Sequence, residues 1–203
     1  MYEYYQTLGF GKSPNLPLGG LAKGKLSSWK NWDAVTRATI SYGHGVSVSL
    51  AQLAQAYTVF AREGDLIPIS LFKKNFQRRG IQVFSYESVK SVRSMLERAS
   101  SSLGTGVKAQ VDGFRIAGKT GTAQKAENGG YSKNRYIASF VGIAPVDKPR
   151  FVIAIMVDEP KGIRSGGHVA APIFSKIAGD ALRRLQMSPN QPNQVLPKTA
   201  LFK

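Results

Sequence analysis

The sequence predicts an α+β fold in which an antiparallel β-sheet is flanked by helices. Apolar residues recur at helical spacing over residues 46–60, 89–103 and 170–185. Residues 114–122, 136–144 and 151–157 are instead short runs dense in β-branched, aromatic and small apolar residues, a composition typical of strands. The turn residues 128–130 and 145–149 separate these strands, and connections this short join antiparallel neighbours, because a parallel crossover needs roughly a dozen residues or more.

The helical segments carry recognisable boundaries. Gly64 follows the first helical pattern at the place of a C-terminal cap, and the second pattern begins near Ser85 and closes at Gly104. In the third, Pro172 is tolerated only near the first turn. The first forty residues are rich in Gly, Pro, Ser and Lys, so we expect them to form a long irregular segment.

Length and composition are those of a folded domain. The chain has 203 residues, of which 42% are hydrophobic and 20% charged, enough for one sizeable core. We expect residues 1–187 to form part of one domain and residues 188–203 to form a polar, disordered tail.

The net charge is +16, which makes nucleic acid, an anionic membrane surface or an acidic polymer conceivable neighbours. The Lys and Arg residues are scattered and do not alternate with aromatic residues in a stripe, so we interpret them as a solvated surface and expect no nucleic-acid partner. The chain has no cysteine, and its two histidines, His44 and His168, lie far apart in the sequence. We therefore expect no metal site and no cofactor.

No apolar run approaches the roughly 18 residues of a membrane span, and the first residues lack the basic and apolar regions of a signal peptide. We therefore expect no membrane anchor or leader within this sequence.

Residues 118–122, Gly-Lys-Thr-Gly-Thr, have two incompatible interpretations. Residues 113–120 fit the P-loop pattern, and residues 152–159 resemble the apolar strand ending in carboxylates that holds magnesium beside such loops. A P-loop, however, follows a strand and opens a helix, whereas residues 114–117 are themselves strand-like and no amphipathic helix can form before the turn at 128–130. A nucleotide phosphohydrolase is therefore the less favoured alternative.

In the second interpretation, Lys119-Thr120-Gly121 is the edge-strand signature of the penicillin-recognising enzymes, whose other signatures are Ser-x-x-Lys and Ser-x-Asn. Further segments carry the same resemblance in the same order: residues 5–12, 37–45, 50–57, 106–109, 115–123 and 170–174. Together they resemble consecutive blocks of class B penicillin-binding proteins over residues 5 to 185. The resemblance is closest to the septal, cell-division type.

This resemblance implies a peptidoglycan D,D-transpeptidase on the periplasmic face of the inner membrane, with stem peptides, β-lactams and division-complex proteins as partners. It implies that Lys119 hydrogen-bonds the serine of Ser-x-Asn and assists proton transfer. It also implies that Thr120 and Thr122 bind a terminal carboxylate and that the backbone N–H of Thr122 forms half of an oxyanion hole. Gly121 would let the substrate backbone approach the strand.

The nucleophile that the family requires has no convincing candidate in this sequence. Residues 27–30 and 70–73 match Ser-x-x-Lys, but neither match begins a helix, and both follow blocks that come after the nucleophile in the family. Ser13-Pro14-Asn15 matches Ser-x-Asn in a loop. We therefore expect the nucleophile and the Ser-x-Asn element upstream of Met1, in the other half of the same domain. We expect a membrane anchor upstream as well.

Two further features bear on function. The missing serine leaves open a catalytically silent module that binds the cell wall or division proteins. Arg164, just before the glycine pair at 166–167, stands where septal enzymes often carry aromatic residues, which puts an apolar wall against substrate side chains in doubt.

Overall fold

The computed structural model describes residues 1–73, 80–127 and 130–189. The chain forms two compact units, Met1–Val92 and Arg93–Lys203, and the boundary between them lies inside helix α4 (Tyr86–Ala99). The predicted end of the domain at residue 187 stays a prediction, and residues 190–203 of the predicted tail lie outside the described residues.

The first unit contains short helices and two small antiparallel ladders. Its elements are α1 (Tyr2–Thr7), β1 (Lys25–Leu26), η1 (Trp29–Asn31), α2 (Ala34–Ile40), β2 (Val46–Ser47), α3 (Leu50–Ala61), β3 (Asp65–Leu66) and β4 (Ile81–Gln82). Strand β1 pairs with β2, and β3 pairs with β4.

The prediction that the first forty residues are irregular throughout is wrong, because they contain α1 and α2. The Asp33 carboxylate caps α2 by accepting a hydrogen bond from the Thr36 N–H at 2.7 Å. The Tyr5 hydroxyl on α1 donates to the Ile40 carbonyl at the end of α2, at 2.8 Å. Helices of six or seven residues are too short to show a periodic apolar pattern, so their stability depends on such caps and tertiary contacts.

Helix α3 begins at Leu50 rather than at Val46, because Ser49 and Gln52 form a capping box and residues 46–47 belong to β2. The side chain of Gln52 is only 2% exposed. Its amide nitrogen donates to the carbonyls of Gly9, Lys12 and Lys23 at 2.8, 2.8 and 3.0 Å. This one buried amide therefore fixes the glycine-rich loops of the first unit to α3.

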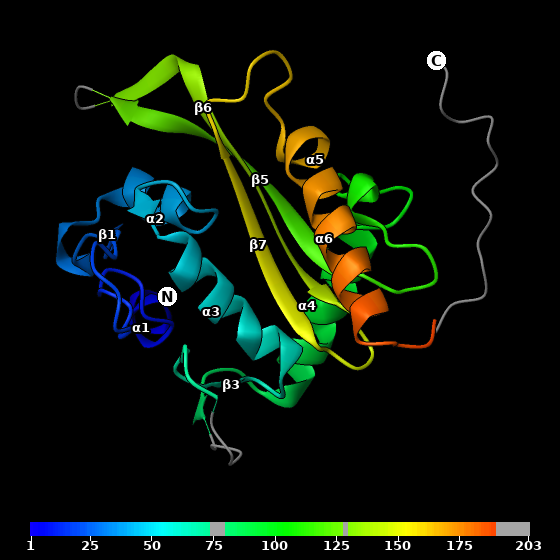
Figure 1. The fold of residues 1–203 in the computed structure, drawn as a ribbon. Coiled ribbons are helices and arrows are strands. Elements are labelled where there is room, and N and C mark those ends of the chain that lie inside the picture. Colours follow the sequence, from blue (N-terminus) through cyan, green and yellow to red (C-terminus); the bar gives the residue numbers. More distant parts are fainter. Residues whose placement is uncertain (74–79, 128–129, 190–203) are drawn as a thin grey trace. The chain divides into compact units, whose positions relative to one another are not determined.

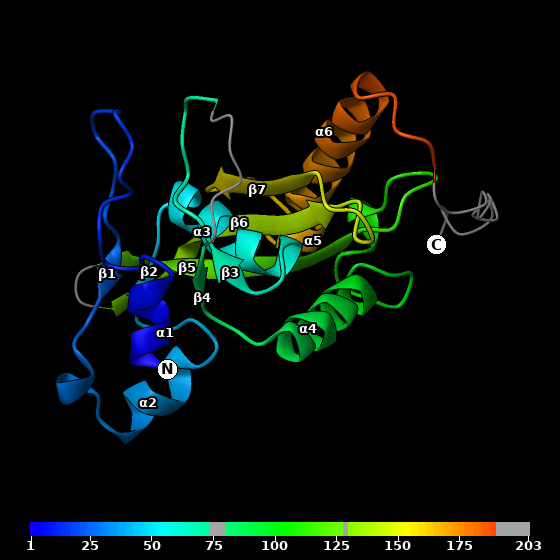
Figure 2. The ribbon, with the colours of Figure 1, turned by 90° about the horizontal axis from the view of Figure 1, so that it is seen from below.

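The second unit contains the predicted sheet. Its elements after α4 are η2 (Val107–Ala109), β5 (Ala117–Glu127), β6 (Gly130–Ala144), β7 (Phe151–Asp158), α5 (Gly166–Val169) and α6 (Ala171–Arg184). The strand order is β5-β6-β7, and both pairings are antiparallel, as predicted. Helices α5 and α6 lie on one face of this sheet (Figures 1 and 2).

Four predicted boundaries in this unit are wrong. Strand β5 begins at Ala117 and continues past Thr122 to Glu127, where it pairs with the first residues of β6 in a two-stranded ribbon. Strand β6 accordingly begins at Gly130 instead of Tyr136. Polar residues can occupy such a ribbon because both of its faces meet water. Helix α4 ends at Ala99, before the predicted Gly104, and residues 128–129 of the predicted turn lie outside the described residues.

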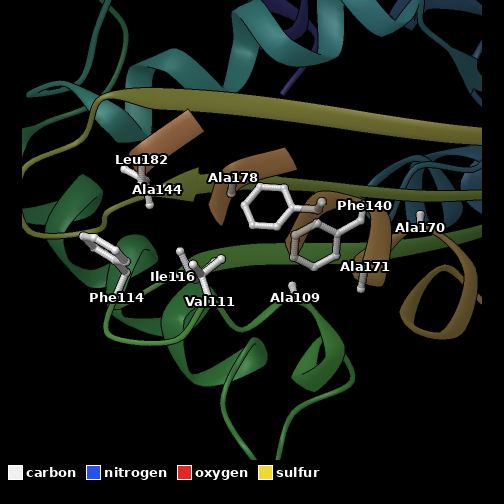
Figure 3. Close-up of a cluster of buried hydrophobic side chains, with 11 residues drawn as sticks. Ala109, Val111, Phe114, Ile116, Phe140, Ala144, Ala170, Ala171, Ala178 and Leu182 are labelled. Carbon is white, nitrogen blue, oxygen red and sulfur yellow. The ribbon is translucent and has the colours of Figure 1, made fainter. Parts of the chain in front are cut away.

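The core of the second unit lies between β6 and α6, where the labelled side chains of Figure 3 converge. The rings of Phe140 and Phe174 are both fully buried, with centroids 4.8 Å apart. Burying one such ring contributes roughly 1.5–3 kcal/mol. Gly118 on β5 makes room for Phe140, since a Cβ at position 118 would lie 2.4 Å from the ring carbon Cζ. The first residues of β5 are therefore held firmly by the core.

Within the described ranges, none of the helices combines the length and the hydropathy needed to cross a membrane. The same ranges contain no group of three or more His, Cys, Asp or Glu side chains placed to hold a metal ion.

Candidate functional site

Strand β5 carries Lys119, Thr120, Gly121 and Thr122 along the border of the sheet. Among the described strands its only neighbour is β6, so the other side of β5 presents backbone N–H and C=O groups that have no strand partner. The side chains of Lys119 and Thr122 are exposed, and the Lys119 Nζ atom lies 3.1 Å from the Thr120 carbonyl. The strand thus combines a primary amine, two hydroxyls and backbone groups without a strand partner within four residues.

Thr120 is contacted by a loop that sequence reasoning did not single out. The Oγ1 atoms of Thr105 and Thr120 lie 3.0 Å apart. The loop is tied to the end of α4, because the Gly106 N–H donates to the Ala99 carbonyl at 2.9 Å. One hydroxyl of the threonine pair must donate to the other, which leaves one O–H hydrogen of the pair available to an incoming acceptor.

Thr122 is contacted by the start of α5. The backbone N–H of Gly166 donates to Thr122 Oγ1 at 3.1 Å. Since this oxygen accepts from Gly166, the hydroxyl hydrogen of Thr122 also remains available to an acceptor. Together with the pair at position 120, the site therefore offers two O–H donors, the number that a carboxylate with two oxygens can use.

The approach of α5 to β5 requires the glycine pair at 166–167. A Cβ at position 166 would lie 2.2 Å from the Ser139 carbonyl oxygen and 2.4 Å from that of Gly121. A Cβ at position 167 would lie 2.3 Å from the carbonyl oxygen of Thr105. Any other residue at these positions would push α5 away from the two threonines.

The outer end of the β5–β6 ribbon carries a network of ion pairs. Lys125 binds Glu159 at 2.8 Å and Asp158 at 3.0 Å, while Arg135 binds Glu127 at 2.6 Å. The hydrogen bond that Lys125 donates to Glu159, followed by the one that it donates to Asp158, raises the pKa of Lys125. The hydrogen bond from Arg135 likewise lowers the pKa of Glu127. The carboxylates at this end are thus already paired with Lys125 and Arg135 of the ribbon.

The rejected Ser-x-x-Lys matches lie outside α-helices, as predicted. The Ser27 hydroxyl and carbonyl oxygens accept from the indole N–H of Trp32 at 3.0 and 3.1 Å, and Ser28 precedes the single 3-10 turn η1. The Ser70 hydroxyl donates to the Phe72 carbonyl at 2.9 Å in a bend. The Ser13 hydroxyl, of the Ser-x-Asn match, lies in a loop 3.4 Å from the Leu21 carbonyl.

The P-loop hypothesis is wrong. Residues 117–120 are the first residues of β5, and the chain continues as strand to Glu127 instead of opening a helix. A phosphate-binding loop needs backbone N–H groups converging at a helix N-terminus, and an extended strand does not provide them.

Comparison with known proteins identifies the family. The family model described as "Penicillin binding protein transpeptidase domain" matches residues 1–179. The chain belongs to this transpeptidase family. The predicted membership of class B and the predicted fold class are confirmed. The relatives are D,D-transpeptidases, and the fold matches a solved transpeptidase domain of a penicillin-binding protein.

Two curated relatives show how much of a transpeptidase the chain spans. It is 38% identical over 204 residues to the probable peptidoglycan D,D-transpeptidase PenA of Neisseria flavescens, covering 100% of this chain and 50% of that protein. It is 37% identical over 191 residues to the peptidoglycan D,D-transpeptidase FtsI of Escherichia coli strain K12, covering 94% of this chain and 32% of that protein. The chain therefore spans between a third and a half of these relatives.

The fold matches solved structures of the same kind. The apo structure of the transpeptidase domain of Burkholderia pseudomallei penicillin-binding protein 3 superposes with a TM-score of 0.88 at 47% identity, covering 94% of this chain and 59% of that one. A structure from Burkholderia ambifaria, titled a peptidoglycan glycosyltransferase, gives a TM-score of 0.85 at 44% identity, covering 95% of this chain and 58% of that one.

Proposed function

We propose that this chain forms the substrate-binding border of a peptidoglycan D,D-transpeptidase that crosslinks stem peptides during septum formation and is acylated by penicillins. The observation that carries the proposal is the two free hydroxyl hydrogens beside β5, one from the Thr105–Thr120 pair and one from Thr122, together with the exposed amine of Lys119. This arrangement suits a substrate that ends in a carboxylate. The names of the relatives, PenA and FtsI, supply the class of reaction.

In the proposed reaction, the two hydroxyls bind the terminal carboxylate of a stem peptide, and the peptide lies along the free border of β5 as an added strand. A serine from outside this chain attacks the carbonyl carbon of the penultimate residue. The C–N bond breaks, the last residue leaves as the free amine after gaining a proton, and an amine of a neighbouring stem peptide then takes the acyl group from the serine.

Lys119 and Thr122 have the catalytic roles in this scheme. The ammonium of Lys119 hydrogen-bonds the serine of the Ser-x-Asn element and assists proton transfer, a contribution typically worth about 10²–10⁴ in rate. The backbone N–H of Thr122 stabilises the developing oxyanion, and one such donor is worth about 2.7–4 kcal/mol. Gly121 lets the substrate backbone approach the strand.

The proposal extends to the setting of the whole protein. A transpeptidase of the septal type acts on the periplasmic face of the inner membrane, with division-complex proteins as neighbours. The resemblance over residues 5–185 supports this setting, and the match to FtsI supports the class of enzyme.

Covalent labelling with a fluorescent penicillin tests the proposal. We compare this chain alone with a joined protein, in which the chain is linked to a segment that carries Ser-x-x-Lys and Ser-x-Asn. We expect label on the joined protein only, blocked by excess unlabelled penicillin and located by mass spectrometry on the serine of the added segment. An adduct on Ser27 or Ser70 would contradict the assignment, and an unlabelled but folded joined protein would support the silent binding module instead.

A further inference from the structure

The side chains on one face of β5 form a polar row with three contacts from other segments. Thr120, Thr122 and Gln124 alternate along the strand and so share a face. The first two contact Thr105 and Gly166, as described above. The amide nitrogen of Gln124 donates to the hydroxyl of Tyr136, its partner across the β5–β6 ladder, at 3.3 Å.

Arg164 stands at the outer end of this row. Its guanidinium carbon lies 4.8 Å from the centroid of the Tyr136 ring. Both ends of its loop are anchored: the Glu159 N–H donates to the Tyr136 carbonyl at 2.9 Å, and the Gly166 N–H donates to Thr122. A cation–π contact is made by the positive charge of the guanidinium, so it leaves N–H donors for a second partner.

Among the described side chains, none supplies a counter-charge to Arg164. The nearby carboxylates Asp158 and Glu159 pair with Lys125, and Glu127 pairs with Arg135. Throughout the parts of the chain that the structure describes, no ion pair includes Arg164. A fixed guanidinium of this kind, beside a border that accepts a peptide, is suited to a carboxylate on the ligand.

From this geometry we infer that Arg164 determines specificity by binding a side-chain carboxylate of the acyl-donor peptide. A strand rises about 3.3 Å per residue, so Gln124 and the Tyr136–Arg164 pair lie about 7 Å along β5 from Thr122. A peptide added to β5 repeats its side chains at the same step. With the terminal carboxylate at Thr120 and Thr122, the group that reaches Arg164 belongs to the part of the peptide that precedes the scissile bond. The inference rests on the proposed function and deepens it.

Two penicillins that differ only in a carboxylate provide the test. Benzylpenicillin and its α-carboxylated derivative carbenicillin share the ring carboxylate and the acyl side chain, which extends away from the reacting centre. We measure the second-order acylation rate constant of each with the joined protein, its Arg164→Gln variant and its Arg164→Lys variant. The matched control is Lys133→Gln, which removes one positive charge from an exposed lysine of β6.

We expect Arg164→Gln to lower the carbenicillin-to-benzylpenicillin ratio by about fivefold, the upper end for an exposed ion pair, while benzylpenicillin itself changes less than twofold. Arg164→Lys should retain part of the preference, and Lys133→Gln should leave the ratio unchanged. An unchanged ratio in Arg164→Gln, or an equal drop in Lys133→Gln, would overturn the inference while leaving the proposed function intact. If neither penicillin acylates the joined protein, the proposed function fails and this inference fails with it.

Discussion

Replacing Gly166 by alanine should separate the start of α5 from strand β5. The added Cβ would lie 2.2 Å from the Ser139 carbonyl oxygen and 2.4 Å from that of Gly121. Both atoms belong to backbone inside the sheet, so they cannot rotate away as the end of a side chain could. Helix α5 must move instead, and the hydrogen bond from the Gly166 N–H to Thr122 is stretched or lost.

The expected loss of stability follows from these contacts. Overpacking a close backbone contact by one methyl typically costs about 1–3 kcal/mol, and losing one hydrogen bond costs about 0.5–1.5 kcal/mol more. We therefore expect Gly166→Ala to lower the free energy of unfolding by about 2–4 kcal/mol. Penicillin acylation of the joined protein should slow as well, because Thr122 loses the contact that orients its hydroxyl.

Urea denaturation, followed by circular dichroism, measures the first effect. The matched control is Gly130→Ala in the same sheet, where, among the described residues beyond its chain neighbours, the added Cβ has no contact closer than 3.9 Å. The control should change the free energy of unfolding by less than about 0.5 kcal/mol. If Gly166→Ala is as stable as the control, the close approach of α5 to β5 is incorrect and the derived geometry of Thr122 fails.

Two further predictions concern the first unit. Gln52→Ala removes the buried donor to three backbone carbonyls and should lower the free energy of unfolding by about 3 kcal/mol, whereas Gln82→Ala, whose exposed amide also donates to two carbonyls, should cost less than about 1 kcal/mol. If urea titrations give equal losses of stability for Gln52→Ala and Gln82→Ala, the amide of Gln52 does not hold the loops to α3. Burial raises the pKa of Tyr57 to about 12, so the folded state disfavours its phenolate. The stability that neutral Tyr57 contributes is therefore present below pH 10 and lost as the pH rises from about 10 to 12, by roughly 3 kcal/mol. Tyr57→Phe should abolish this part of the loss of stability at alkaline pH, measured as the free energy of unfolding between pH 10 and 12. If the variant loses as much stability as the parent protein over that range, Tyr57 is not buried as described.

Sequence patterns predicted those elements whose signal is long and periodic. The apolar positions of α3, α4 and α6 repeat over three turns or more, and the strand composition of β7 matches its observed bounds closely. The short helices α1 and α2 were missed because they depend on the Asp33 cap and on the distant contact between Tyr5 and Ile40. The outer half of β5 was missed because its polar residues form a ribbon that buries neither face, so no apolar alternation marks it.

The residues of the candidate site also fall into two groups, those that a local sequence motif identifies and those that only the fold brings together. Lys119 to Thr122 could be identified from a local motif, because four consecutive residues carry its chemistry. Thr105 and Gly166 could not, since each reaches β5 from a remote part of the chain. The glycine pair at 166–167 was the one visible hint, and only the packing against Ser139 and Thr105 gives its reason.

The central claim is that β5 supplies the amine of Lys119 to the proton transfer that accompanies acylation of the serine, and the acylation rate of Lys119→Ala tests it most directly. The rate constant for fluorescent penicillin should fall by about 10²–10⁴ in the joined protein carrying this variant. It should be unchanged in Lys133→Ala, which removes an exposed lysine from the neighbouring strand. A folded Lys119→Ala protein that is acylated within twofold of the parent rate would contradict the account.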